Sequence, residues 1–162
     1  MSTIMNRKRE FPGEGKWGGR FVIQTTTSGP INDNYSKQGY LCNDWFPSRR
    51  LRPVFDNLLA NNQQTYSLHR NFSITNQYTM LSTRHFANFF KTEGPFVGYE
   101  NFHKKYGQRS AYYTLSRVGF NPQKTKALVY VFERSTPISA FSRFIQLNKI
   151  RGKWSVAKEF GC

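Results

Sequence analysis

The clearest pattern of hydrophobic and polar residues lies between residues 112 and 132, where it predicts two strands joined by a turn. Tyr112–Phe120 is rich in aromatic and β-branched residues, and Ala127–Phe132 is almost wholly apolar. The dipeptide Asn121-Pro122 between them is typical of a turn. This hairpin is the strongest fold signal in the chain, and we expect Ala127–Phe132 to be its buried strand.

Two more strands are predicted after the hairpin. Arg134–Ser139 is a loop, and Phe141–Ile150 then alternates between apolar and polar residues, as a strand exposed on one side does. Arg151–Lys153 makes a tight turn, and Trp154–Phe160 returns as the last strand. The four strands together predict an antiparallel meander that buries its apolar face against helices.

Three helical patterns come before the hairpin. The first begins at Pro53, a residue suited to the first turn of a helix, and ends near Asn61-Asn62. The second begins at Ser82 or Thr83, and the third covers about Val97–Tyr106. Their apolar faces are formed by Val54, Phe55, Leu58 and Leu59 in the first, Phe86, Phe89 and Phe90 in the second, and Tyr99, Phe102 and Tyr106 in the third. A short strand is expected between the first and second helices.

The first 50 residues carry no helical period. Glycines and prolines interrupt this segment throughout, and only Arg20–Thr27 resembles a strand. Aromatic residues are interspersed among these breakers, which is unlike a solvated linker. We expect either that the segment wraps its own domain or that it runs onto a neighbouring macromolecule.

These elements predict an α+β fold in two parts. Residues 1–50 are expected to be a long, irregular, basic anchoring extension. Residues 51–162 are expected to form a curved antiparallel sheet, the C-terminal four-strand meander, packed against two or three helices.

Three stretches of the C-terminal half also resemble a known pattern. They are LSRVGFN (Leu115–Asn121), KALVYV (Lys126–Val131) and GKWSVAKEF (Gly152–Phe160). The pattern is similar to that of uncharacterised bacterial α+β proteins, and the resemblance implies a cystatin-like or nuclear-transport-factor-like cone. It implies a fold and no activity. Members of this group often carry a Gly- and Cys-containing stretch after the second strand, whereas Arg134–Ala140 here has neither residue.

Charge gives the main functional signal. The chain of 162 residues has 24 Lys and Arg against nine Asp and Glu, a formal net charge of +15 and a pI near 10.2. A surface this cationic attracts polyanions, so RNA, DNA, an anionic membrane surface and an acidic protein are all reasonable partners. Because the cations are spread along the chain, the sequence does not define a single patch.

Nothing in the sequence indicates a disulfide framework, a metal site or a targeting segment. The two cysteines and three histidines show no metal-ligand spacing. No apolar run is long enough for a transmembrane segment, and the first residues lack the apolar core of a secretory signal. We expect a reducing intracellular compartment, either the cytoplasm or an organelle matrix, with attachment to the periphery of a membrane complex as an alternative.

Catalytic patterns are equally scarce. The histidines lie in separate segments, and carboxylates are too few and too dispersed to pair as acid and base. The Gly-rich stretch Gly13–Arg20 lacks the ending and the preceding strand of a phosphate-binding loop. We therefore expect a protein that is not an enzyme and that needs no cofactor.

The leading hypothesis is a non-catalytic accessory or structural subunit, held among the other protein subunits of a large complex by its basic extension. One alternative is an RNA-binding, ribosome-associated protein, and another is a ligand-binding or enzymatic cone. The residues expected to contact a polyanion or partner are Arg7, Lys8, Arg9, Lys16, Trp17, Arg20, Arg49, Arg50, Arg52, Lys104 and Lys105.

Overall fold

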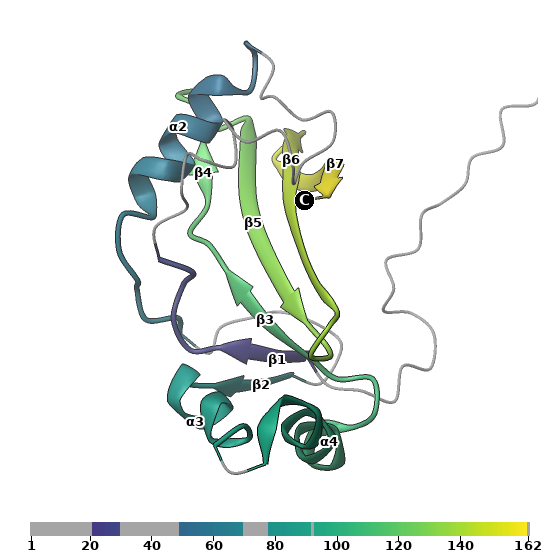
Figure 1. Cartoon of the computed structure of the whole chain (residues 1–162). Helices are drawn as coiled ribbons and strands as arrows, with labels where there is room; N and C mark the ends of the chain where they lie inside the picture. The colour runs from purple at the N-terminus through teal and green to yellow at the C-terminus, as the bar shows by residue number, and fades with distance from the viewer. Residues whose placement is uncertain (1–20, 30–48, 70–77, 92, 162) are drawn as a thin grey trace, which may run out of the picture.

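The computed structural model describes residues 21–29, 49–69, 78–91 and 93–161, which form a mixed α+β fold (Figure 1). This confirms the predicted class. A seven-stranded sheet and three helices make up the described part of the chain. In chain order the elements are β1 (Phe21–Gln24), α2 (Arg52–Asn61), β2 (Tyr78–Leu81), α3 (Thr83–Asn88), α4 (Gly94–Tyr106), β3 (Ala111–Leu115), β4 (Gly119–Phe120), β5 (Lys126–Arg134), β6 (Ala140–Ile150) and β7 (Lys153–Gly161).

The strands lie in the order β2-β1-β3-β5-β6-β7, and β4 pairs with β5. From β3 to β7 every pairing is antiparallel. β1 is parallel to both β2 and β3, so the expectation of a purely antiparallel sheet is wrong. Parallel neighbours need long connections, and the intervals between β1, β2 and β3 are long enough to supply them.

β1 comes from the segment that the sequence assigned to the extension. Its Val22 is fully buried and pairs with Thr79 of β2 and Tyr112 of β3. The strand-like character of Arg20–Thr27 therefore reflects a strand of the sheet itself. The sequence could not place it, because its partners lie more than 50 residues further along the chain.

The predicted strand Tyr112–Phe120 is divided into β3 and β4. Ser116 lies at the break, where its backbone N–H donates to the carbonyl of Tyr130 at 2.9 Å. Its Oγ accepts the N–H of Tyr130 at 2.8 Å. The Ser116 hydroxyl thus takes the place of a backbone carbonyl as the acceptor for the Tyr130 N–H. On either side of the break, β3 and β4 pair with β5 through their backbones.

The first core lies between α2 and the C-terminal strands. Val54, Phe55 and Leu58 of α2 are essentially inaccessible and pack on Leu128 and Phe144. The Phe55 and Phe144 rings meet edge to face with centroids 5.8 Å apart. The predicted apolar stripe of the first helix is therefore the face of α2 that packs on the sheet. Apolar residues recur at helical spacing because only this face of the helix is buried.

The second core lies at the other end of the sheet, beneath α3 and α4 (Figure 1). Phe86 of α3 stacks on Tyr112 of β3 with centroids 3.8 Å apart, and Phe102 of α4 is fully buried beside it. The register places Tyr112 opposite Arg134, on the same face as Leu128 and Tyr130. All three described helices consequently cover one face of the sheet.

The third helix is longer than predicted. α4 begins at Gly94, three residues before the predicted start at about Val97, so Gly94-Pro95 forms the first turn of the helix and not a break before it. Pro95 occupies the first turn, where its missing N–H has no helical partner to lose. The predicted end at Gly107 is confirmed: its N–H donates to the carbonyl of His103 at 2.8 Å, and its φ of 108° favours glycine.

Candidate nucleic-acid interface

The structure separates the predicted contact residues into two places. Arg49 and Arg50 immediately precede α2, and Arg52 is its first residue; all three are exposed. Lys104 and Lys105 lie in the last turn of α4. The remaining predicted residues lie outside the described ranges, namely Arg7, Lys8, Arg9, Lys16, Trp17 and Arg20.

The two places are at opposite ends of the molecule, because α2 begins at one end of the sheet and α4 covers the other (Figure 1). Lys105 lies over aromatic rings of its own neighbourhood, with its Nζ 5.8 Å from the Phe89 centroid and 5.5 Å from that of Tyr106. At the α4 end, Glu93 and Glu100 lie among the cations. Charges of both signs are therefore mixed there.

At the α2 end, three segments distant in sequence come together. They are the start of α2, the turn between β4 and β5, and the turn between β6 and β7 (Figure 1). The N–H of Lys149, near the end of β6, donates to the carbonyl of Thr125 in the β4–β5 turn at 2.8 Å, which brings the two turns to the same end of the sheet. We call this region the basic end and define it by its cations, Arg49, Arg50, Arg52, Lys124, Lys126, Lys149, Arg151 and Lys153.

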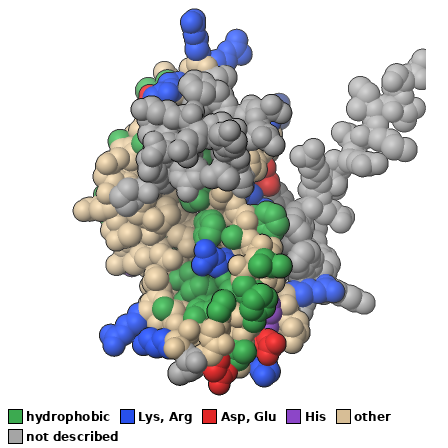
Figure 2. All heavy atoms as spheres, in the orientation of Figure 1, with side chains coloured by type: hydrophobic (Ala, Val, Ile, Leu, Met, Phe, Trp, Pro, Cys, Tyr) green, Lys and Arg blue, Asp and Glu red, His purple; other side chains and the backbone are tan. Residues whose placement is uncertain are grey.

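Asp56 is the carboxylate that the described chain brings to the basic end, and it binds Arg52 with an Nε to Oδ1 distance of 2.8 Å. The other ion pair between described residues joins Arg143 to Glu133. Figure 2 shows Lys and Arg side chains projecting from the end of the molecule where α2 begins. Seven cations at this end thus have no carboxylate partner among the described residues, and their charges are available to a ligand.

Lys124 and Arg151 each lie in a tight turn and are exposed to solvent. Asn121 organises the first: its Oδ1 accepts the N–H groups of Thr125 at 2.8 Å and Lys126 at 2.7 Å. Lys124 has a φ of 50°, in the left-handed region that a turn requires. In the second turn Arg151 and Gly152 both have positive φ, as in the two-residue hairpin turn that matches strand twist. Lys124 and Arg151 are therefore exposed on short, hydrogen-bonded supports.

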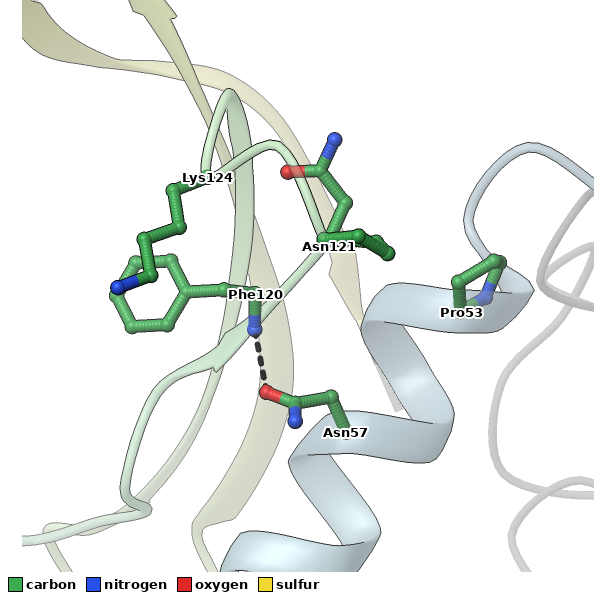
Figure 3. A pocket seen from close by; sticks show the side chains of 6 residues that line it. Pro53, Asn57, Phe120, Asn121 and Lys124 are labelled. Atoms are coloured by element: carbon green, nitrogen blue, oxygen red, sulfur yellow. Dashed lines mark hydrogen bonds between the residues drawn. The ribbon is translucent and has the colours of Figure 1, made fainter.

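A hollow of about 320 Å³ lies between α2 and the first of these turns. Its lining comprises Pro53, Asn57, Phe120, Asn121, Pro122 and Lys124 (Figure 3). The Oδ1 of Asn57 accepts the backbone N–H of Phe120 at 2.8 Å, which fixes β4 against the helix. The hollow is open to solvent and combines amide groups, apolar rings and one ammonium group.

Aromatic side chains continue from the hollow across the sheet. The Phe120 and Trp154 rings are 5.7 Å apart with an interplanar angle of 54°. The Nζ of Lys149 is 5.7 Å from the centroid of Trp154. Trp154 is 39% exposed, so part of a large aromatic surface beside these cations is available to solvent.

The sequence did not single out the cations of the two turns. It predicted both turns and their strands, but Lys124, Arg151 and Lys153 were only part of a diffuse positive charge. The available signal was their position beside turn residues, Asn121-Pro122 and Gly152, because turn tips project from a sheet. That signal could not indicate that the two turns meet.

A second polar cluster lies on the face of the sheet opposite the helices. Tyr113 of β3 pairs with Glu133 of β5, and the Glu133 carboxylate binds Arg143 of β6 at 3.1 Å. Burial, together with the nearby Glu133 charge, raises the pKa of Tyr113 to about 12. The hydroxyl is therefore protonated at neutral pH, and the cluster holds its charges in an internal pair.

Within the described ranges, no three His, Cys, Asp or Glu side chains are grouped so that they could hold a metal ion. The helices of that part of the chain are too short or too polar to cross a membrane. Both cysteines lie outside it. Comparison of the chain with protein-family models, curated proteins and solved structures found no match.

Proposed function

We propose that this protein is a non-catalytic subunit of a larger assembly and that it contacts RNA through its basic end. The observation that carries the proposal is the convergence of eight cations and one carboxylate from three segments of the chain. Exposed Lys and Arg side chains bind phosphates and release condensed counterions, which is the main source of affinity for a nucleic acid. The cations of residues 1–20 would add to this contact by charge.

The composition of the basic end favours RNA over an acidic protein or an anionic membrane. Positive charge alone would be sufficient to bind an acidic protein or an anionic membrane. Here, exposed aromatic surface of Trp154 lies directly beside Lys149, and Phe120 connects it to the hollow that Lys124 lines. Aromatic rings interleaved with cations suit a ligand that has both phosphates and bases.

The packing gives less support to a ligand-binding or enzymatic cone. Such a protein needs an enclosed cavity with convergent polar groups between its helices and its sheet. In the described part of the chain, Phe55 and Phe144 fill the space beneath α2, and Phe86, Phe102 and Tyr112 fill the space beneath α3 and α4. The cystatin-like cone and the anchoring role of residues 1–50 remain predictions.

The proposal is tested by titrating fluorescently labelled RNA with the full-length protein at several salt concentrations. We expect the affinity to fall steeply with salt. The double variant Lys124→Gln/Arg151→Gln should bind more weakly, and the slope of log affinity against log salt should decrease by about 1 for each phosphate contact removed.

The matched control is Lys104→Gln/Lys105→Gln, which removes the same charge at the α4 end. It should retain most of the affinity and of the salt slope. Equal losses in the two double variants would contradict a basic end that acts as the contact surface. A salt-independent affinity, or the absence of RNA binding, would overturn the proposal.

A further inference from the structure

We infer that the basic end takes single-stranded rather than duplex RNA, with a base stacked on Trp154 and phosphates on the surrounding cations. This inference rests on the proposed function and specifies its ligand. Four features support it: the position of Trp154 in the sheet, its continuity with Phe120, the arrangement of the cations, and the accessibility of bases in a single strand.

Trp154 lies on a face of the sheet that the described helices leave uncovered. It pairs with Lys149 of β6, and Val156 pairs with Leu147. Positions 147 and 149 alternate with Phe144, which packs beneath α2, so they project from the opposite face. Phe144 is fully buried, whereas Trp154 is 39% exposed. The sheet thus presents an indole ring on its open face, two residues after the β6–β7 turn.

Phe120 extends this aromatic surface toward the β4–β5 turn. Its ring lies 5.7 Å from that of Trp154, at a tilt of 54°. Phe120 also lines the hollow with Pro53, Asn57 and Lys124 (Figure 3). The Oδ1 of Asn57 accepts the backbone N–H of Phe120 at 2.8 Å, so α2 fixes the position of Phe120 in β4.

Cations flank the platform on both sides. The Nζ of Lys149 lies 5.7 Å from the Trp154 centroid, Arg151 occupies the adjoining turn, and Lys153 begins β7. On the other side is Lys124, which lines the hollow together with Phe120. The arginines that begin α2 lie on the helix-covered side of the sheet, beyond this platform. An RNA strand that crosses from the β6–β7 turn to the β4–β5 turn would place its backbone near cations at both ends and its bases near the rings in the middle.

A duplex would use only part of this surface. Its bases are stacked and paired within the helix, so it presents mainly phosphates and sugars to a protein. A single strand has unstacked bases, every one of which has a π-face that can lie on an aromatic ring. The exposed indole therefore contributes affinity for a single strand that a duplex cannot obtain.

The experiment measures binding of the full-length protein to labelled oligo(U), to an RNA duplex of the same length and to heparin, a polyanion without bases. Trp154→Leu removes the ring and retains an apolar side chain, and Trp154→Phe retains a ring. Thermal unfolding of each variant shows whether it is folded at the temperature of the assay.

We expect Trp154→Leu to weaken oligo(U) binding by about fivefold to 150-fold, the range that stacking of one base provides. Its heparin binding should be unchanged, and Trp154→Phe should retain most of the oligo(U) affinity. The wild-type protein should bind oligo(U) more tightly than the duplex. Lys124→Gln/Arg151→Gln should weaken binding to all three ligands.

Three results would overturn the inference and leave the proposed function standing. These are an unchanged oligo(U) affinity in Trp154→Leu, an equal loss for heparin in that variant, and duplex binding as tight as single-strand binding. By contrast, failure of the wild-type protein to bind any RNA would overturn the proposed function itself. Binding to phosphatidylserine vesicles is measured in parallel. A preference for these vesicles over oligo(U) would overturn both the inference and the proposed function, because it would indicate a membrane ligand.

Discussion

The side chain of Asn62 exchanges two hydrogen bonds with the backbone of Arg117, 55 residues away in the sequence. Its Oδ1 accepts the N–H of Arg117 at 2.8 Å, and its Nδ2 donates to the Arg117 carbonyl at 3.1 Å. The same Nδ2 donates to the carbonyl of Leu58 at 2.7 Å. Asn62 is fully buried, so this one amide joins the end of α2 to the break between β3 and β4.

Replacing Asn62 by alanine should therefore destabilise the protein. The substitution removes three hydrogen bonds made by a fully buried side chain, and we expect the free energy of unfolding to fall by about 2 to 4 kcal/mol. Urea denaturation measures the change. Gln63→Ala is the control, because Gln63 is exposed and its side chain bonds only locally, to Leu59. A loss in Asn62→Ala no larger than in this control would contradict the structural role of Asn62.

Gly119 should not tolerate a side chain. A Cβ at this position would lie 2.5 Å from the backbone nitrogen of Leu58 and 2.6 Å from the carbonyl oxygen of Val54. Because both atoms belong to the backbone of α2, the helix itself would have to move. We expect Gly119→Ala to lower the free energy of unfolding by about 3 kcal/mol.

Gly161 provides the matched control for Gly119. It lies in β7, and no atom lies within 4 Å of the position that its Cβ would occupy. Gly161→Ala should change the free energy of unfolding by no more than about 0.5 kcal/mol. Equal effects of the two substitutions in urea denaturation would show that α2 does not pack closely on β4.

Two tyrosines of the second core should respond oppositely to loss of the hydroxyl group. The hydroxyl of Tyr99 is buried and makes no hydrogen bond within the described structure, so Tyr99→Phe should be neutral or stabilising by up to about 1 kcal/mol. The hydroxyl of Tyr112 donates to Gln24 at 3.3 Å and to the Leu81 carbonyl at 3.5 Å. Tyr112→Phe should cost about 0.5 to 1.5 kcal/mol. Equal losses in thermal or urea unfolding would contradict the difference in hydrogen bonding.

Tyr113 should make the stability sensitive to alkaline pH. Burial and the Glu133 charge raise its pKa from 10.0 to about 12 in the folded protein. The unfolded chain therefore loses this proton first, and the stabilisation is complete below pH 10 and is lost as the pH rises toward 12. Tyr113→Phe removes this dependence. We expect the difference in unfolding free energy between wild type and Tyr113→Phe to change between pH 10 and 12.

Absorbance titration of the folded protein provides an independent measurement for Tyr113. Subtracting the titration curve of Tyr113→Phe from that of the wild type should reveal one phenol with a pKa of about 12. A difference curve centred near 10, the ordinary value, would show that Glu133 and burial do not act on this hydroxyl.

The helices were largely predictable because their determinants are local. The spacing of apolar residues predicted that Phe55, Leu58 and Phe86 would be buried. Pro53 marks the start of α2 because its fixed φ suits the first turn of a helix, and Gly107 marks the end of α4 because glycine readily adopts a positive φ. The start of α4 was missed because Gly-Pro serves equally as a break or as a first turn. Tertiary packing on the sheet decides between the two.

Local sequence patterns were sufficient to predict the α+β class, a turn at Asn121-Pro122, a turn at Arg151–Lys153, and the excess of positive charge. Tertiary structure was needed to place β1 between β2 and β3. It also brings the turns that hold Lys124 and Arg151 to the end of the sheet where α2 begins, whereas α4 lies at the other end (Figure 1). The reason is physical: turns and helix periods depend on neighbouring residues, whereas a binding surface depends on strand pairing between distant segments. The basic end exists because the β5–β6 register brings two turns together, and no local pattern encodes that register.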